Sequence, residues 1–132
     1  MTILKTFKIA QEFSSVANLY EHLAQNIERI SDLIEIKIQE NSLQEEMFCL
    51  VGKEQVTEKN ILFFASKKDF PNNLGELIFF AGMFEIDIVV FLATEPTKAC
   101  LTSFRWLQSI CNPDTEFILG EVRIHDYRLP RR

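Results

Sequence analysis

The sequence predicts a single α/β domain in which helices flank a mixed β-sheet. Two runs that are apolar on both faces, residues 61–65 and 88–93, have the composition of central strands covered on each side. Amphipathic helical repeats precede, separate and follow these runs. A strand–helix–strand order implies parallel neighbouring strands joined by right-handed crossovers, which places the helices on the faces of one sheet.

Length and composition suit one globular domain over residues 1–132. Apolar residues make up 47% of the chain and charged residues 25%, a balance typical of folded rather than disordered proteins. The sequence has no apolar run of about 18 residues and no long apolar segment near its start. We therefore expect a cytoplasmic protein that has no membrane partner.

The first predicted element is an amphipathic helix over about residues 15–31, where apolar residues recur at helical spacing. Ser14 or Ser15 can cap its start by accepting a backbone N–H. Before it, residues 6–9 form a short extended stretch within an N-terminal arm of residues 1–11.

Three strands follow in the predicted order. Isoleucines alternate with polar residues over positions 34–38, which indicates a strand with one buried face. A turn at Asn41 leads to a second strand at residues 47–51, and Gly52 with a polar stretch makes the next turn. Residues 61–65 complete an antiparallel meander as a central strand.

The second half alternates helices and strands. Asn72 or Asn73 caps a helix that carries residues 74–81, and an apolar strand follows at 88–93. Pro96 opens the next helix, since its missing N–H costs nothing in a first turn, and Asn112-Pro113 ends it. A last strand spans about 116–127, so the predicted order is αβββαβαβ.

Charge and cysteine content limit the possible functions. The net charge of −5 opposes non-specific attachment to nucleic acid, whose affinity comes mainly from phosphate neutralisation. A basic tail at residues 128–132 is the one dense cationic cluster, and its Arg128, Arg131 and Arg132 are candidate nucleic-acid contacts or simply a solvated terminus. Three cysteines without a C-x-x-C pair indicate small core residues rather than disulfides or a zinc site.

Two further side chains have a structural and a functional interpretation. His22 falls on the polar side of the first helix and is expected at the surface. Trp106, next to Arg105, could offer a base-stacking platform, but a partly buried helix aromatic is the simpler interpretation.

A resemblance to a known superfamily rests on the later half of the chain. Its motifs are LGELIFFA at 74–81, DIVVFLA at 87–93, RWL at 105–107 and FILGEV at 117–122. Together they resemble the back half of small bacterial and archaeal domains with a restriction-endonuclease-like, PD-(D/E)xK fold. The resemblance implies an Asp on the second strand and a Glu-x-Lys on the third, which bind Mg²⁺ and activate the attacking water.

This chain departs from that pattern at its acidic positions. The third strand ends in Ala65-Ser66-Lys67, which keeps the lysine but has a methyl group where the carboxylate belongs. The second strand, 47–51, contains no carboxylate. Because Mg²⁺ requires hard oxygen ligands, we expect no cofactor and a disabled site in which Ala65 and Phe48 or Cys49 fill the metal position.

In an alternative interpretation, the chain retains nuclease activity because its metal-binding carboxylates have moved to neighbouring elements. Glu46 and Asp69 would bind Mg²⁺, while Lys67 and Glu76 would serve catalysis. The competing interpretation makes Glu46 and Asp69 ordinary loop residues and Glu76 a solvated acid favoured by the helix dipole. We expect Glu46, Asp69 and Glu76 not to converge on one point.

Three functions therefore remain open from sequence. The first is a non-catalytic nuclease-fold module that binds a protein or nucleic-acid partner. The second is a metal-dependent nuclease with the migrated site. The third is a homodimeric structural subunit whose exposed apolar face includes Phe70, Phe79 or Phe84.

Overall fold

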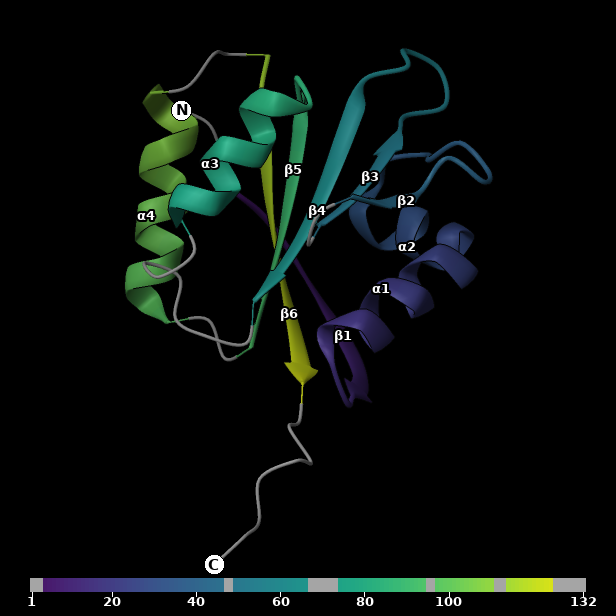
Figure 1. The fold of residues 1–132 in the computed structure, drawn as a ribbon. Coiled ribbons are helices and arrows are strands. Elements are labelled where there is room, and N and C mark those ends of the chain that lie inside the picture. The colour runs from purple at the N-terminus through teal and green to yellow at the C-terminus, as the bar shows by residue number, and fades with distance from the viewer. Residues whose placement is uncertain (1–3, 47–48, 67–73, 95–96, 111–113, 125–132) are drawn as a thin grey trace, which may run out of the picture.

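The computed structural model describes residues 4–46, 49–66, 74–94, 97–110 and 114–124. Within these ranges the chain forms six strands and four helices: β1 (Lys5–Phe13), α1 (Val16–Gln25), α2 (Ile27–Ile34), β2 (Gln44–Glu46), β3 (Cys49–Lys53), β4 (Asn60–Ser66), α3 (Leu74–Met83), β5 (Ile88–Thr94), α4 (Lys98–Ile110) and β6 (Glu116–Ile124). All six strands join one sheet in the order β1-β6-β5-β4-β3-β2 (Figure 1). The predicted α/β class with one mixed sheet is confirmed.

The sheet has a parallel and an antiparallel part. β4, β5, β6 and β1 are parallel neighbours, whereas β2, β3 and β4 form an antiparallel meander. α3 connects β4 to β5, and α4 connects β5 to β6, as expected for parallel crossovers.

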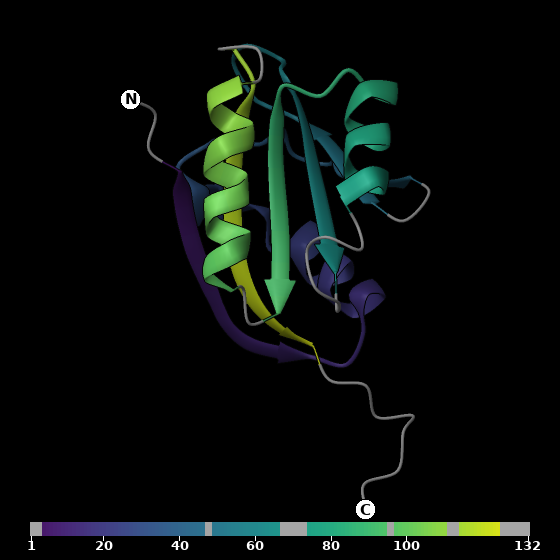
Figure 2. The same ribbon diagram turned by 90° about the vertical axis from the view of Figure 1, so that its left-hand side faces the viewer.

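Two layers of helix cover the sheet. α1 and α2 lie on one face and α3 and α4 on the other, as the two views show (Figures 1 and 2). Successive side chains of β4 point to opposite faces, so Phe63 packs on the α1–α2 side and Phe64 on the α3–α4 side. Every residue of β5 from Ile88 to Ala93 is buried, which confirms its prediction as a central strand.

The predicted first helix is broken at Asn26. The side-chain amide of Asn26 donates a hydrogen bond to the carbonyl oxygen of His22 at 2.9 Å, and its backbone N–H donates to the same oxygen at 3.0 Å. Asparagine competes in this way with regular helical bonding. The result is two helices, α1 and α2, in place of one.

The strand predicted at residues 34–38 is wrong. Ile34 is the last residue of α2, and Glu35 then takes a left-handed conformation with φ 59°. Ile38 makes a single isolated bridge to Glu54. Ile36 and Ile38 nevertheless pack against the α1–α2 core, so the alternation correctly predicted burial but not strand pairing.

The meander uses different residues from those predicted. β2 (Gln44–Glu46) takes the place of the expected first strand, and the second strand runs to Lys53 through Gly52. Gly52, expected in a turn, lies within β3, and Leu43 packs over it: a Cβ at this position would come within 2.6 Å of Leu43 Cδ2. No helix in the described ranges is long and apolar enough to cross a membrane.

The expected N-terminal arm is a full edge strand. β1 pairs in parallel with β6, from Lys5 opposite Ile118 to Phe13 opposite Ile124, with an irregularity between Lys8 and Glu12. The sequence reasoning missed this strand because its partner lies far away in the chain, where local periodicity carries no signal.

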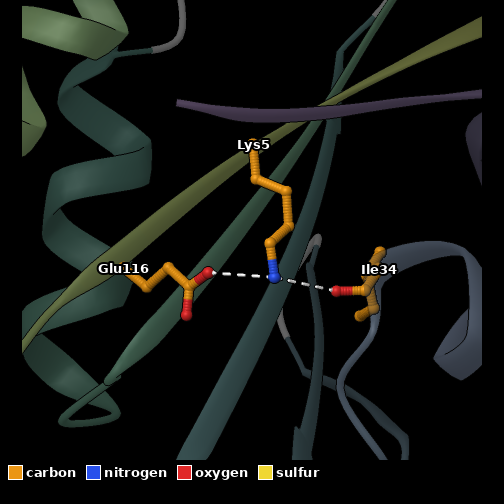
Figure 3. Close-up of polar contacts among 3 residues, drawn as sticks. All are labelled: Lys5, Ile34 and Glu116. Carbon is orange, nitrogen blue, oxygen red and sulfur yellow. Dashed lines mark hydrogen bonds and ion pairs between the residues drawn. The ribbon is translucent and has the colours of Figure 1, made fainter. Parts of the chain in front are cut away.

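At the start of β1, the side chain of one lysine contacts both β6 and the end of α2. Lys5 Nζ lies 3.4 Å from Glu116 Oε2 of β6 and donates a hydrogen bond to the carbonyl oxygen of Ile34 at 3.2 Å (Figure 3). That carbonyl belongs to the last turn of α2, where helical carbonyls lack intrahelical partners and a cation is favoured. Lys5 therefore links β1 to β6 and to the end of α2.

Candidate functional site

The superfamily resemblance places its chemistry at the C-terminal end of β4. By that resemblance Ala65 would stand where the metal-binding carboxylate is expected, and it is only 7% exposed. It packs within the core on the α1–α2 side of the sheet and lies opposite Leu92 of β5. Lys67, two residues on, lies outside the described residues.

A tyrosine from α1 closes over this position. The hydroxyl oxygen of Tyr20 accepts a hydrogen bond from the backbone N–H of Ala65 at 3.0 Å, and both residues are buried. Burial raises the pKa of Tyr20 well above its ordinary value of 10.0, although the Ala65 hydrogen bond partly opposes this shift. Tyr20 is therefore a neutral phenol, which provides no negative charge for a cation.

The second strand supplies no compensating ligand. Cys49, one of the two residues expected beside Ala65, packs instead on the α3–α4 side of the sheet, so that alternative is wrong. Its Sγ donates a hydrogen bond to the carbonyl oxygen of Glu46 at 3.0 Å. Burial, with a smaller contribution from Glu46, raises the pKa of the Cys49 thiol to about 11. Phe48 lies outside the described residues.

The candidate carboxylates lie on separate elements. Glu46 is the last residue of the edge strand β2, and Glu76 is an exposed acid in the first turn of α3. Over the described ranges, no cluster of three or more His, Cys, Asp or Glu side chains could hold a metal ion. Asp69, the third proposed carboxylate, falls outside those ranges, so convergence of all three stays a prediction.

A shallow groove does lie on the Ala65 side of the sheet. Its lining comes from α1 and β2 and consists of Ala17, Asn18, Tyr20, Glu21, Ala24 and Glu45. Two carboxylates and no cation line it, so the groove would repel a phosphodiester. Sequence reasoning did not select Tyr20, because its contact with β4 joins residues 45 positions apart in the chain.

The basic residues of β1 and β6 are matched by acids. Lys5 lies 3.4 Å from Glu116, Lys8 lies 3.9 Å from Glu121, and Arg123 lies 3.7 Å from Glu12. Such exposed pairs contribute little stability, but they neutralise positive charge along this edge. Arg128, Arg131 and Arg132, the candidate nucleic-acid contacts, lie outside the described residues.

No protein-family model matches this chain, and no curated protein or solved structure is significantly similar to it. The superfamily resemblance therefore stays a prediction.

The molecule presents one further feature, an apolar outer surface on its helices α3 and α4. Phe79 of α3 is 60% exposed, as predicted for an apolar face, whereas Phe84 is half-buried. Trp106 of α4 is exposed too, which corrects the expectation that it would be partly buried. His22 is not a free surface residue, because its ring is half-buried and contacts Phe13 edge-on at 5.1 Å.

Proposed function

We propose that this chain is a non-catalytic module with a restriction-endonuclease-like fold, which acts by binding a protein partner. An antiparallel meander followed by two parallel crossovers supports the fold, since the motif order implies that arrangement. The observation that carries the loss of catalysis is the closed end of β4, where Ala65 and the neutral Tyr20 phenol replace a metal-binding carboxylate.

Charge and surface favour a protein over a nucleic acid as the partner. The chain carries a net charge of −5, and the basic residues of the β1–β6 edge are already paired with glutamates. Nucleic-acid affinity depends on releasing counterions with unpaired cations. Exposed aromatic and aliphatic side chains on α3 offer instead the apolar surface that protein interfaces use.

Cleavage assays test the loss of catalysis directly. Purified protein is incubated with single- and double-stranded DNA and RNA in Mg²⁺, in Mn²⁺ and in EDTA, beside Lys67→Ala and Glu76→Ala variants. We expect no metal-dependent cleavage by any of them. Cleavage by the unaltered chain that either substitution abolishes would establish the migrated-site nuclease and overturn the proposal.

A titration with labelled nucleic acids tests the choice of partner. Fluorescence anisotropy is recorded for DNA and RNA over a range of salt concentrations. We expect no specific binding. Tight binding that weakens steeply as salt rises would show a nucleic-acid module and would contradict a protein partner.

A further inference from the structure

Helix α3 carries two apolar stripes on opposite sides. The inner stripe, Leu77 and Phe80 with the half-buried Ala81 and Phe84 beyond, packs on the sheet. The outer stripe occupies positions i, i+3, i+4, i+7 and i+8, namely Gly75, Ile78, Phe79, Gly82 and Met83. Ile78 is 56% exposed and Met83 is 44% exposed. A helix that is apolar all round is normally buried, so this outer stripe lacks a cover within the described chain.

The two glycines of the outer stripe are not required by the packing of a single chain. Among the described residues, no atom would lie within 4 Å of a Cβ at Gly75 or Gly82. Glycine lowers the stability of a helix interior relative to alanine, so two of them in ten residues weaken α3 without an internal benefit. A bare stretch of helix does allow a second backbone to approach closely.

We propose that the cover is a second copy of this chain, with the two α3 helices packed antiparallel across a two-fold axis. This inference names the partner in the protein-binding function proposed above and rests on it. The outer stripe reads small–large–large–small, and its spacing is symmetric about a point between Ile78 and Phe79. An antiparallel pair thus places Gly75 opposite Gly82 of the second copy, and Ile78 opposite Phe79.

Two-fold interfaces require this self-complementarity, because each contact of residue i with residue j is repeated as j with i. A parallel pair would instead bring the two Glu76 carboxylates, in the first turns, next to each other. The antiparallel arrangement separates these like charges. The Phe79 side chain is also ordered before a partner binds, since its ring contacts that of Phe80 edge-on with the ring centroids 5.8 Å apart.

The exposed area suits a dimer of standard size. Phe79 alone offers on the order of 100 Å² of apolar surface at its observed exposure. With Ile78, Met83 and the exposed Trp106 and Ile110 of α4, on the same side of the sheet (Figure 2), the total is roughly 500 Å². A standard interface buries about 800 Å² per partner, of which about 56–65% is non-polar, so the areas agree for a dimer that covers α4 as well as α3.

Sedimentation of the full chain tests the dimer. We expect the unaltered chain to be dimeric at about 10 μM, and Phe79→Glu to raise the dissociation constant at least ~100-fold. Leu33→Glu is the matched control, because Leu33 is 45% exposed on helix α2, on the opposite face of the sheet. This variant should remain dimeric. An unaltered chain that is monomeric at about 100 μM would overturn the inference.

The glycines give a second readout that separates assembly from folding. Gly82→Ala should raise the thermal midpoint of the monomer, yet weaken dimerisation about tenfold or more by blocking close approach. Equal dimerisation in this variant would contradict close helix packing. For orientation, Ile78→Cys should form an intermolecular disulfide under mild oxidation while Glu76→Cys should not. The reverse pattern would exclude the antiparallel pair.

These outcomes are separable from those of the cleavage assay. A monomer without nuclease activity would remove the second copy as the partner and leave the non-catalytic function standing. A dimer that cleaves nucleic acid would support the second copy as the partner and overturn the non-catalytic function.

Discussion

Removing the Tyr20 hydroxyl should destabilise the fold without creating a cavity. In Tyr20→Phe the ring still fills its place in the core, but the backbone N–H of Ala65 loses its acceptor. Both residues are buried, so water does not replace the lost bond. Leaving a buried donor unsatisfied costs about 1–3 kcal/mol, and removal of the buried hydroxyl itself offsets part of that cost. We expect a net loss of about 1–2 kcal/mol in the free energy of unfolding.

Urea unfolding followed by circular dichroism measures this loss, which corresponds to a fall of about 4–7 °C in the melting temperature for a chain of this size. Thr102→Val, an isosteric loss of an exposed hydroxyl on α4, is the control and should stay within about 0.5 kcal/mol of the unaltered chain. Hydrogen exchange should also speed up at the Ala65 amide in Tyr20→Phe. Unchanged stability together with unchanged exchange at that amide would refute the role given to the hydroxyl.

Three other predictions concern packing, pH and the β1 contact. Gly120→Ala should lower the free energy of unfolding by about 1–3 kcal/mol, because the new Cβ would lie 2.8 Å from Leu92 Cδ2 and 2.7 Å from Phe7 Cε1. Phe7→Leu should restore part of this stability, and strictly additive stability changes in the double mutant would contradict crowding between the two residues. The folded-state pKa of Cys49, about 11, exceeds the ordinary value of 9.0, so its contribution to stability is present below pH 9 and is lost as pH rises from 9 to 11. In urea unfolding over this pH range, Cys49→Ala should show a shallower loss of stability than the unaltered chain. An equally steep loss would show that the Cys49 thiol is not its cause. Lys5→Met should lower stability by about 1 kcal/mol in low salt, and no loss would show that the bond to the end of α2 is dispensable.

The parts of the fold that were predictable are those with a local physical cause. β4 and β5 are apolar on both faces because helices cover both sides of the sheet, and that composition is visible in sequence. The isoleucines before β2 were misassigned because alternate burial of an extended segment looks the same whether or not it pairs with a neighbour. β1 escaped prediction because its hydrogen-bonding partner is β6.

In the candidate site too, features local in sequence were predictable and contacts between distant residues were not. The superfamily resemblance implies a carboxylate at position 65, two residues before Lys67 and on the same strand face, and the sequence has alanine there. What replaces that carboxylate was not predictable, because Tyr20 reaches β4 from a helix 45 residues earlier in the chain. The choice between Phe48 and Cys49 beside Ala65 could not be made from sequence, because consecutive strand residues point to opposite faces and both faces of this strand are apolar.

The pairing of β1 with β6 has a consequence for how the chain is made. Of the six described strands, β1 is synthesised before the other five, yet it pairs only with β6, which is synthesised after them. Until then β1 presents an unpaired edge, while the meander and its crossover helices can form from closer contacts. Pairing of β1 with β6 is therefore expected to be the late, slow step of folding, because it has the largest sequence separation of the described strand pairs.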